Sequence, residues 1–173
     1  GTERLLTERL ELRRFTMEDL EHMFTNWASD PEVARYITWP AHKDRDVTSD
    51  VMKRWMEHYP NPNFYQWAIV VKELNQPIGS ISVVNSSEGN EHCEIGYCIG
   101  RAFWNKGYTT EALKCVMNFL FHEVGYERIE AQYQKDNLGS GMVMKKAGMS
   151  YEGIKRHAYK NRDDQFVDLV LYG

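Results

Sequence analysis

The sequence predicts a single α/β (α+β) domain with a mixed, mostly antiparallel sheet of about seven strands, flanked by about four helices. Two patterns support this fold class. Between residues 67 and 99, apolar residues alternate with other residues in three consecutive stretches, which is typical of an antiparallel meander. Between residues 93 and 133, a strand, a helix and a second strand follow one another, and such a unit places its two strands in parallel. No repeat, linker or low-complexity segment divides the 173 residues, so we expect one domain over residues 1–173.

The first third of the chain predicts one short strand and two helices. Residues 10–12 alternate between apolar and charged side chains in the strand, and Thr16 is placed to cap a helix that ends near Asp30. After a loop, a second helix carries apolar residues on one side over residues 47–55 and is closed by Pro60. Both helices precede most of the sheet.

The meander strands are expected at residues 67–71, 81–83 and 93–99, with a turn at Asn75–Pro77 between the first two. Helical spacing of apolar residues follows over residues 107–124. These elements place the longest helix directly after the third meander strand.

The rest of the chain predicts one strand, one short helix and a final hairpin. The strand alternates over residues 129–133, and Asn137 caps a helix that ends at Gly148. The hairpin runs over residues 149–172 and turns near residues 161–164. The strand at residues 129–133 completes the unit with two parallel strands.

The composition argues against several kinds of partner. With 42% hydrophobic and 13% aromatic residues, the chain can bury a core. Its formal net charge of -4 provides no basic excess, so we expect no nucleic-acid partner. Apolar runs such as Ala68–Val71 are far shorter than the roughly 20 residues that span a bilayer, so we expect no membrane association. Gly1–Leu6 lacks the apolar core of a signal peptide, and we therefore expect a cytoplasmic protein.

The cysteines and histidines predict no metal centre. Cys93, Cys98 and Cys115 are odd in number and form no Cys-x-x-Cys pair, which indicates reduced, buried thiols. The six histidines are scattered, and no spacing brings two of them onto one face of a helix or strand. Cys98 has no histidine near it in the sequence, so we interpret it as a packing residue and not as a nucleophile.

A candidate anion site lies between the third meander strand and the helix that starts at Gly107. The first N–H groups of a helix have no partner within it, and the helix dipole adds positive charge there. Gly107 lets the backbone approach a phosphate closely, while Lys106, Thr109 and Thr110 offer further donors. The same residues are equally compatible with an ordinary capped connection. No P-loop motif and no Gly-x-Gly-x-x-Gly motif accounts for the site.

Two motifs around this loop resemble the acetyl-CoA motif of the GNAT superfamily of N-acetyltransferases. They are Glu94-Ile95-Gly96-Tyr97 and Trp104-Asn105-Lys106-Gly107-Tyr108-Thr109-Thr110-Glu111-Ala112. The superfamily pattern is Gln/Arg-x-x-Gly-x-Gly/Ala. Gly107 matches this pattern, whereas Trp104 stands at the Gln/Arg position and Thr109 at the final small position.

Further segments resemble the RimJ and RimL branch of ribosomal-protein acetyltransferases, so that the resemblance spans nearly the whole chain. They are Thr7-Glu8-Arg9-Leu10-Glu11-Leu12-Arg13, Asn137-Leu138-Gly139-Ser140, Lys145-Lys146-Ala147-Gly148-Met149, and Glu152-Gly153 followed by Arg156, Asp168 and Tyr172. The resemblance implies a GNAT-like sheet in which the two parallel strands splay apart. The gap between Cys98–Ile99 and Gln132–Tyr133 would then admit the pantetheine arm of acetyl-CoA.

The resemblance also implies that acetyl-CoA is the co-substrate. Backbone N–H groups near Cys98 and Ile99 are expected to bind the thioester oxygen. Asn137, which also suits a helix N-cap, is expected to bind the pantetheine chain. The loop residues expected to hold the cofactor are Trp104, Asn105, Lys106, Gly107, Tyr108, Thr109 and Thr110.

Two residues are candidates for catalysis. Many superfamily members protonate the leaving thiolate with a tyrosine, at the position that Met144 occupies here. Ser140 is our candidate for that role, where a hydrogen bond suffices because a thiolate of pKa near 8.5 is already a fair leaving group. Glu94 is the candidate base, acting through water, with a solvated strand-face carboxylate as the alternative interpretation.

The expected activity is direct transfer of acetyl to a primary amine. The resemblance favours a protein N-terminal amine, such as the alanine of a ribosomal protein, ahead of a small-molecule amine such as a polyamine or antibiotic. A non-catalytic acyl-CoA-binding module is the alternative from a different class. Tyr36, Trp39 and His42 lie in the loop that the resemblance places over the acceptor cleft, where they either contact the acceptor or anchor the loop by packing. The assembly is left open between a monomer and a homodimer.

Overall fold

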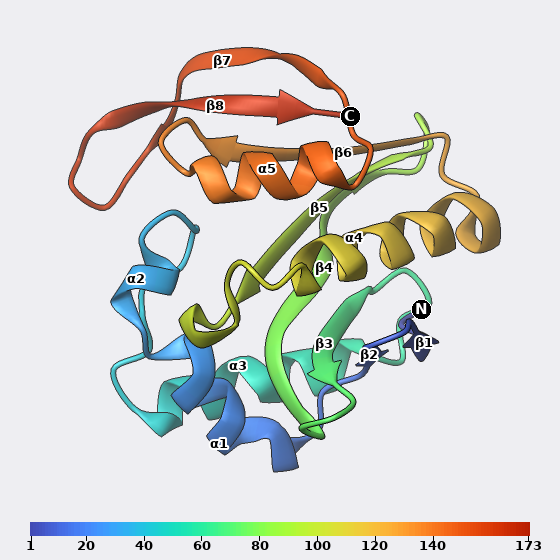
Figure 1. Cartoon of the computed structure of the whole chain (residues 1–173), viewed down its shortest axis with the longest axis vertical. Coiled ribbons are helices and arrows are strands. Elements are labelled where there is room, and N and C mark those ends of the chain that lie inside the picture. The colour runs from blue at the N-terminus through green and yellow to red at the C-terminus, as the bar shows by residue number, and fades with distance from the viewer.

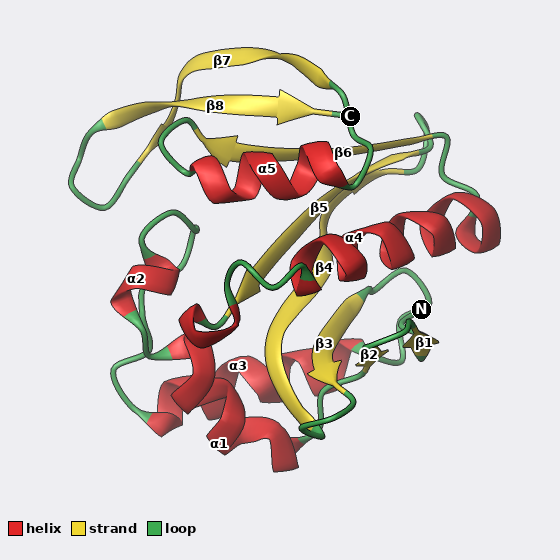
Figure 2. Cartoon of the chain, in the orientation of Figure 1, coloured by secondary structure: helices red, strands yellow, loops and turns green.

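The computed structural model describes residues 1–173 as one eight-stranded sheet with helices packed on it (Figures 1 and 2). The strands lie in the order β1-β2-β3-β4-β5-β6-β8-β7. They are β1 (Leu5–Leu6), β2 (Leu10–Arg13), β3 (Gln66–Val71), β4 (Gln76–Ser87), β5 (His92–Ile99), β6 (Arg128–Gln134), β7 (Tyr151–Lys160) and β8 (Phe166–Tyr172). The helices are α1 (Leu20–Met23), α2 (Pro31–Ala34), α3 (Arg45–His58), α4 (Tyr108–Phe119) and α5 (Leu138–Lys146). No helix combines the length and apolar character needed to cross a membrane.

The expected fold class is confirmed, with one additional strand and one additional helix. The strand is β1, whose two residues pair with β2 in an antiparallel hairpin. The helix is the single turn α2, where the side chain of Asp30 accepts a hydrogen bond from the N–H of Glu32 at 3.0 Å. Pro31 begins this turn, a position where its missing N–H costs no hydrogen bond.

The helix expected after Thr16 is less regular than its apolar spacing predicts. It consists of a 3₁₀ turn (Met17–Asp19), α1, and a π-helical turn (Phe24–Ala28). Thr16 is the N-cap residue of this helix as expected, and its backbone N–H donates to Asp19 Oδ2 at 2.9 Å, which is one half of a capping box. The helix therefore begins where the sequence predicts, but its hydrogen bonding changes twice along its length.

The turn before β4 was expected at Asn75–Pro77 and lies slightly earlier. The N–H of Asn75 donates to the carbonyl of Val71 at 2.8 Å, and Asn75 has a φ of 52°. Pro77 lies within β4, opposite Val70, where the register shifts. A register shift interrupts the ladder, which lets proline enter a strand despite its missing N–H.

Two apolar clusters cover the two faces of the sheet. Alternate residues of β3 point to opposite faces, and all six are buried. Trp67 and Ile69 belong to the larger cluster, which includes residues of α4 and α5. Ala68 and Val70 belong to the smaller cluster with residues of α1 and α3. The helices of the N-terminal part and those of the C-terminal part therefore pack on opposite faces.

The parallel pair expected in the sheet is formed by β5 and β6, and it is short. Only three residue pairs are in register, and the last is Glu94 with Glu130. Beyond that point β5 continues to Ile99 while β6 pairs with β8 instead. The two strands diverge, as Figure 1 shows, which confirms the splayed arrangement.

Candidate active site

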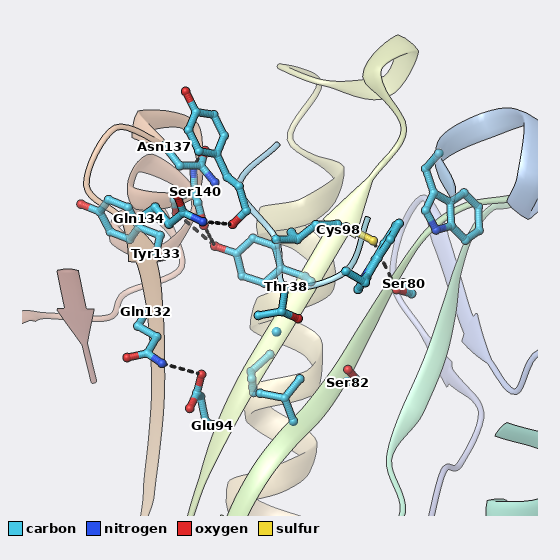
Figure 3. Close-up of a pocket in the computed structure, with 18 of the residues that line it drawn as sticks. Thr38, Ser80, Ser82, Glu94, Cys98, Gln132, Tyr133, Gln134, Asn137 and Ser140 are labelled. Carbon is cyan, nitrogen blue, oxygen red and sulfur yellow. Dashed lines mark hydrogen bonds between the residues drawn. The ribbon is translucent and has the colours of Figure 1, made fainter. Parts of the chain in front are cut away.

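A cavity of about 480 Å³ opens where β5 and β6 part (Figure 3). Its volume is in the range of small-molecule sites. Among its lining residues, Glu94 is the only carboxylate and Arg54 the only lysine or arginine. The lining residues that the sequence predicts for the site are Tyr36, Trp39, His42, Glu94, Cys98, Asn137 and Ser140.

The register of β4 and β5 decides which backbone N–H groups face the gap. In an antiparallel pair, residues whose N–H and C=O bond to the neighbouring strand alternate with residues whose groups point away. The N–H of Gly100 donates to the carbonyl of Ile78, the residue that precedes Gly79 of β4, at 2.8 Å. By the same alternation, the N–H of Cys98, two residues earlier, also points to β4. The N–H groups of Tyr97 and Ile99 therefore face the gap. Of the two residues expected to offer an N–H group to the thioester oxygen, only Ile99 has one that faces the gap, and the second gap-facing N–H belongs to Tyr97 instead of Cys98.

The thiol of Cys98 has the surroundings of a packing residue, as expected. Its Sγ lies 3.5 Å from Ser80 Oγ. Burial raises the pKa of the Cys98 thiol, which keeps it protonated at neutral pH, whereas a nucleophilic cysteine needs a lowered pKa. The side chain therefore forms part of the cavity wall without being activated.

Ser140 meets a second hydroxyl group across the cavity. The hydroxyl of Tyr97, on β5, lies 2.9 Å from Ser140 Oγ and donates to the Ser140 carbonyl at 3.0 Å. Burial raises the pKa of Tyr97, so its proton is retained. The N–H of Ser140 donates to Asn137 Oδ1 at 3.4 Å, which makes Asn137 the N-cap of α5. The two hydroxyl groups thus form a connected pair of proton donors.

Glu94 is half-buried at the base of the gap. Its Oε2 accepts a hydrogen bond from Gln132 Nε2 at 3.3 Å, across the two splaying strands (Figure 3). Burial raises the pKa of Glu94, the neighbouring carboxylate of Glu130 raises it further, and Lys155 and Gln132 oppose the shift. A raised carboxyl pKa makes Glu94 a stronger base than a solvated glutamate.

The loop that carries Tyr36, Trp39 and His42 along the cavity is bonded to the C-terminal half of the chain. Gln134 Nε2 donates to the carbonyl of Tyr36 at 3.3 Å. Arg162, from the turn between β7 and β8, donates to the carbonyl of Trp39 at 3.0 Å. These bonds hold the loop at the cavity although it is far from β6 and β8 in the sequence.

His42 is neutral and anchored by its neighbours. Its Nδ1 lies 2.7 Å from Thr48 Oγ1, and its ring is 5.2 Å from that of Trp39. Burial lowers the pKa of His42, so the ring carries no charge at neutral pH. Of the two interpretations for this residue, its contacts favour packing within the loop.

The expected cofactor loop has the geometry of an anion site. Gly107 is the N-cap of α4 with a φ of 80°, and Asn105 also has a positive φ of 61°. No hydrogen bond within the protein uses the backbone N–H groups of residues 105–110. Trp104 Nε1 donates to the carbonyl of Ile99 at 2.9 Å, which links the loop to the end of β5. Six consecutive N–H groups are therefore free to bind an anion next to the gap.

Two side chains change the expected picture of the site. Thr109 is only 8% exposed, so the donor expected from it is its N–H group rather than a solvent-facing hydroxyl. Tyr97 was expected only as part of a motif, and its hydroxyl was not assigned a role. One signal was available: Tyr97 is the one hydroxyl-bearing residue in the alternating run Cys93, Ile95, Tyr97 and Ile99. Met144, at the position of the usual tyrosine, is 1% exposed and belongs to the core.

Comparisons with known proteins identify the family of this chain. Residues 9–150 match the family model described as Acetyltransferase (GNAT) domain. The chain is 29% identical over 170 residues to the uncharacterized N-acetyltransferase p20 of Bacillus licheniformis, covering 98% of this chain and 94% of p20. It is 26% identical over 176 residues to the ribosomal protein uS5-alanine N-acetyltransferase of Escherichia coli, covering 97% of this chain and 88% of that protein.

A solved structure of an acetyltransferase shares the fold of this chain. RimL, a ribosomal alpha-N-protein acetyltransferase in complex with coenzyme A, matches with a TM-score of 0.87 and 18% identity over 98% of this chain and 96% of RimL. The fold and the matched model define this chain as an acyltransferase. It belongs to the GNAT family of N-acetyltransferases, as the motifs around Gly107 predict.

Proposed function

We propose that this chain transfers acetyl from acetyl-CoA directly to a primary amine, and that the amine is a protein N-terminus. The observation that carries the proposal is the cavity at the splayed end of β5 and β6, which holds one carboxylate and adjoins six unpaired N–H groups. The activity of the uS5-alanine N-acetyltransferase and the coenzyme bound to RimL support both substrates.

The residues present fit acetyl-CoA, which supplies the acetyl group as an activated thioester. The N–H groups of residues 105–110 and the dipole of α4 suit its pyrophosphate. Asn137 lies beyond the C-terminal end of β6, at the open end of the gap, and lines the cavity, where its amide side chain would bind a pantetheine amide. Arg54 and Glu94 are the only charged side chains in the cavity, so its remaining walls suit an uncharged arm.

Each catalytic role then falls to a group of this chain. The N–H groups of Tyr97 and Ile99 donate to the thioester oxygen and stabilise negative charge that develops there. Glu94 accepts the ammonium proton of the acceptor through water, because a half-buried carboxylate with a raised pKa is a competent base. The hydroxyl pair of Tyr97 and Ser140 stabilises the departing thiolate, which leaves as free thiol after it takes up the second proton of the acceptor nitrogen.

The charges of the cavity favour a protein N-terminus over a polyamine. A polyamine brings several ammonium groups, and each buried cation needs a carboxylate partner. Glu94 is the only carboxylate among the lining residues, and Arg54 repels further cations. A chain terminus with one amine matches a site with one carboxylate. A small monoamine remains the second candidate.

Release of free thiol from acetyl-CoA over a panel of amines tests this proposal. Peptides with N-terminal alanine or serine are compared with the same peptides carrying a blocked N-terminus, with spermidine and with aminoglycosides. We expect release above the rate without acceptor only for the free peptides. Release with spermidine or an aminoglycoside alone would move the activity to small amines. Coenzyme A binding without release for any amine would indicate a non-catalytic module.

Loss of either hydroxyl of the pair should lower the rate of transfer modestly. Tyr97→Phe and Ser140→Ala each remove one hydroxyl group from the pair that stabilises the thiolate, so we expect kcat to fall roughly 10-fold with little change in the KM for acetyl-CoA. Because the two hydroxyl groups bond to each other, the double variant should lose less than the product of the two single effects. Steady-state kinetics of the three variants checks this. Unchanged kcat in both single variants would remove the pair from the mechanism.

A further inference from the structure

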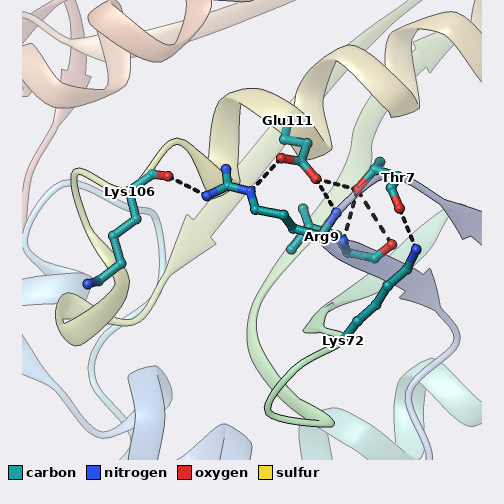
Figure 4. Close-up of polar contacts among 6 residues, drawn as sticks. Thr7, Arg9, Lys72, Lys106 and Glu111 are labelled. Carbon is teal, nitrogen blue, oxygen red and sulfur yellow. Dashed lines mark hydrogen bonds and ion pairs between the residues drawn. The ribbon is translucent and has the colours of Figure 1, made fainter.

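Arg9, which directly precedes β2, makes a set of contacts with the loop that the proposed function assigns to acetyl-CoA. We infer that Arg9 is a positioning residue that locks the Lys106–Gly107 peptide in the orientation needed for anion binding. The inference rests on that proposed function, and it adds a residue from the N-terminal hairpin to the cofactor site. Figure 4 shows the contacts that support it.

The guanidinium of Arg9 lies against residues 106–108 of the loop. Its Nη1 donates to the carbonyl of Lys106 at 2.9 Å (Figure 4). Its Cζ lies 4.4 Å from the centre of the Tyr108 ring. A Cβ placed on Gly107 would stand 3.3 Å from Arg9 Nη2, which shows how closely the side chain approaches the loop. The loop therefore rests against Arg9 over three consecutive residues.

The bond to Lys106 determines the direction of the next N–H group. Every peptide bond in the chain is trans, and in a planar trans peptide the C=O and the N–H point in opposite directions. When the carbonyl of Lys106 points to Arg9, the N–H of Gly107 points away from Arg9. Gly107 has a φ of 80° and no Cβ, so this peptide can turn over readily without such a restraint. Arg9 thus suppresses a rotation that would present a carbonyl to the anion.

Arg9 is itself held by Glu111, in the first turn of α4. Its Nε donates to Glu111 Oε1 at 2.8 Å and its backbone N–H to Oε2 at 3.0 Å. Thr7 also donates to this carboxylate, and Lys72 donates its N–H to the carbonyl of Arg9 at 2.9 Å. Burial raises the pKa of Glu111, but hydrogen bonds from Thr7 and Arg9 outweigh it and lower that pKa overall. The carboxylate stays ionised, and Arg9 offsets its charge next to the anion site.

The test compares Arg9→Ala, Arg9→Lys and the wild type for coenzyme A affinity by calorimetry and for the KM of acetyl-CoA. For Arg9→Ala we expect roughly 10-fold weaker binding and a similar rise in KM, since a charge-assisted hydrogen bond is lost, with kcat nearly unchanged. A lysine ammonium lacks the rigid planar fork by which the guanidinium bonds to the Lys106 carbonyl and to Glu111 at the same time, so Arg9→Lys should restore only part of the affinity. The matched control is Arg4→Ala, which removes another exposed ion pair of the same hairpin, with Glu11, and should leave affinity unchanged.

Four outcomes would overturn the inference. Equal affinity in the wild type and Arg9→Ala would show that the loop needs no lock. Full recovery of coenzyme A affinity in Arg9→Lys, or loss of the difference between Arg9→Ala and the wild type at high salt, would mean that only the positive charge of residue 9 matters. A similar loss in Arg4→Ala, together with lowered thermal midpoints, would assign it to general stability. Failure of the wild type to bind coenzyme A would instead overturn the proposed function, so the two failures are distinguishable.

Discussion

Replacing Gly107 with glutamate should weaken coenzyme A binding roughly 100-fold or more and leave the protein folded. The new carboxylate would stand at the N-terminus of α4, beside the N–H groups that suit the pyrophosphate. Two like charges about 5 Å apart at an effective dielectric constant of about 20 repel by roughly 3 kcal/mol, which is roughly 100-fold in affinity. The φ of 80° adds strain for any residue with a Cβ, on the order of 1–2 kcal/mol.

Two further variants separate these contributions. Gly107→Ala introduces the strain and the contact with Arg9 without a charge, so its loss of affinity should be much smaller. Gly89→Glu introduces the same charge at an exposed turn where a Cβ meets no atom within 4 Å, and should bind normally. Calorimetry with coenzyme A measures affinity, and circular dichroism confirms folding. Unaltered binding by Gly107→Glu would place the cofactor elsewhere on the protein.

The structural features that the sequence predicted correctly are those that depend on neighbouring residues in the chain. Gly107 permits the positive φ that begins α4, and Asn137 caps α5 through a bond to a residue three positions away. Thr16 likewise marks the true start of its helix. A cap or a positive φ is decided by a few neighbouring residues, so the residue type at that position is informative by itself.

The parts that the sequence did not predict depend on contacts between distant segments. Tyr97 and Ser140 are 43 positions apart, and the side chains of Arg9 and Glu111 are 102 positions apart. The first pair meets because β6 parts from β5 and leads into α5, and the second pair meets because α4 packs beside β2. The spacing of apolar residues predicts each strand but not its register. The assignment of the gap-facing N–H to Tyr97 instead of Cys98 needed that register.

Two short elements, β1 and α2, were not predicted from the sequence for a similar reason. A strand of two residues and a helix of four are too short for a periodic pattern to appear. The β1 strand exists because β2 offers it an edge, and α2 because Asp30 caps it. Arg101 donates two further hydrogen bonds to Asp30, so the cap depends on a residue 71 positions away.

Glu94→Gln should lower kcat/KM roughly 100-fold, the lower range for loss of a general base. The amide keeps an oxygen that can accept the hydrogen bond from Gln132, so the geometry of the gap is preserved while the basic group is lost. In the wild type, kcat/KM should rise with pH as Glu94 ionises. This rise should occur at a higher pH than for an ordinary glutamate, because burial raises the pKa of Glu94. The variant should lack this rise and keep only the one due to the acceptor amine. An unchanged profile would make Glu94 the solvated strand-face carboxylate of the alternative interpretation.

The same substitution should make the protein more stable at neutral pH. Because burial, and then the charge of Glu130, raise the pKa of Glu94 in the folded state, that state binds the proton more tightly than the unfolded chain does. The resulting stabilisation is fully present below the unfolded pKa of about 4.3 and is lost as pH rises through the folded pKa. At pH 7 the ionised carboxylate therefore destabilises the fold, and glutamine carries no such charge. Thermal midpoints measured from pH 4 to pH 8 should show a gain for Glu94→Gln that grows with pH, whereas a constant difference would mean that Glu94 titrates alike in both states. Higher stability with lower activity would identify Glu94 as a group retained for chemistry at the expense of the fold.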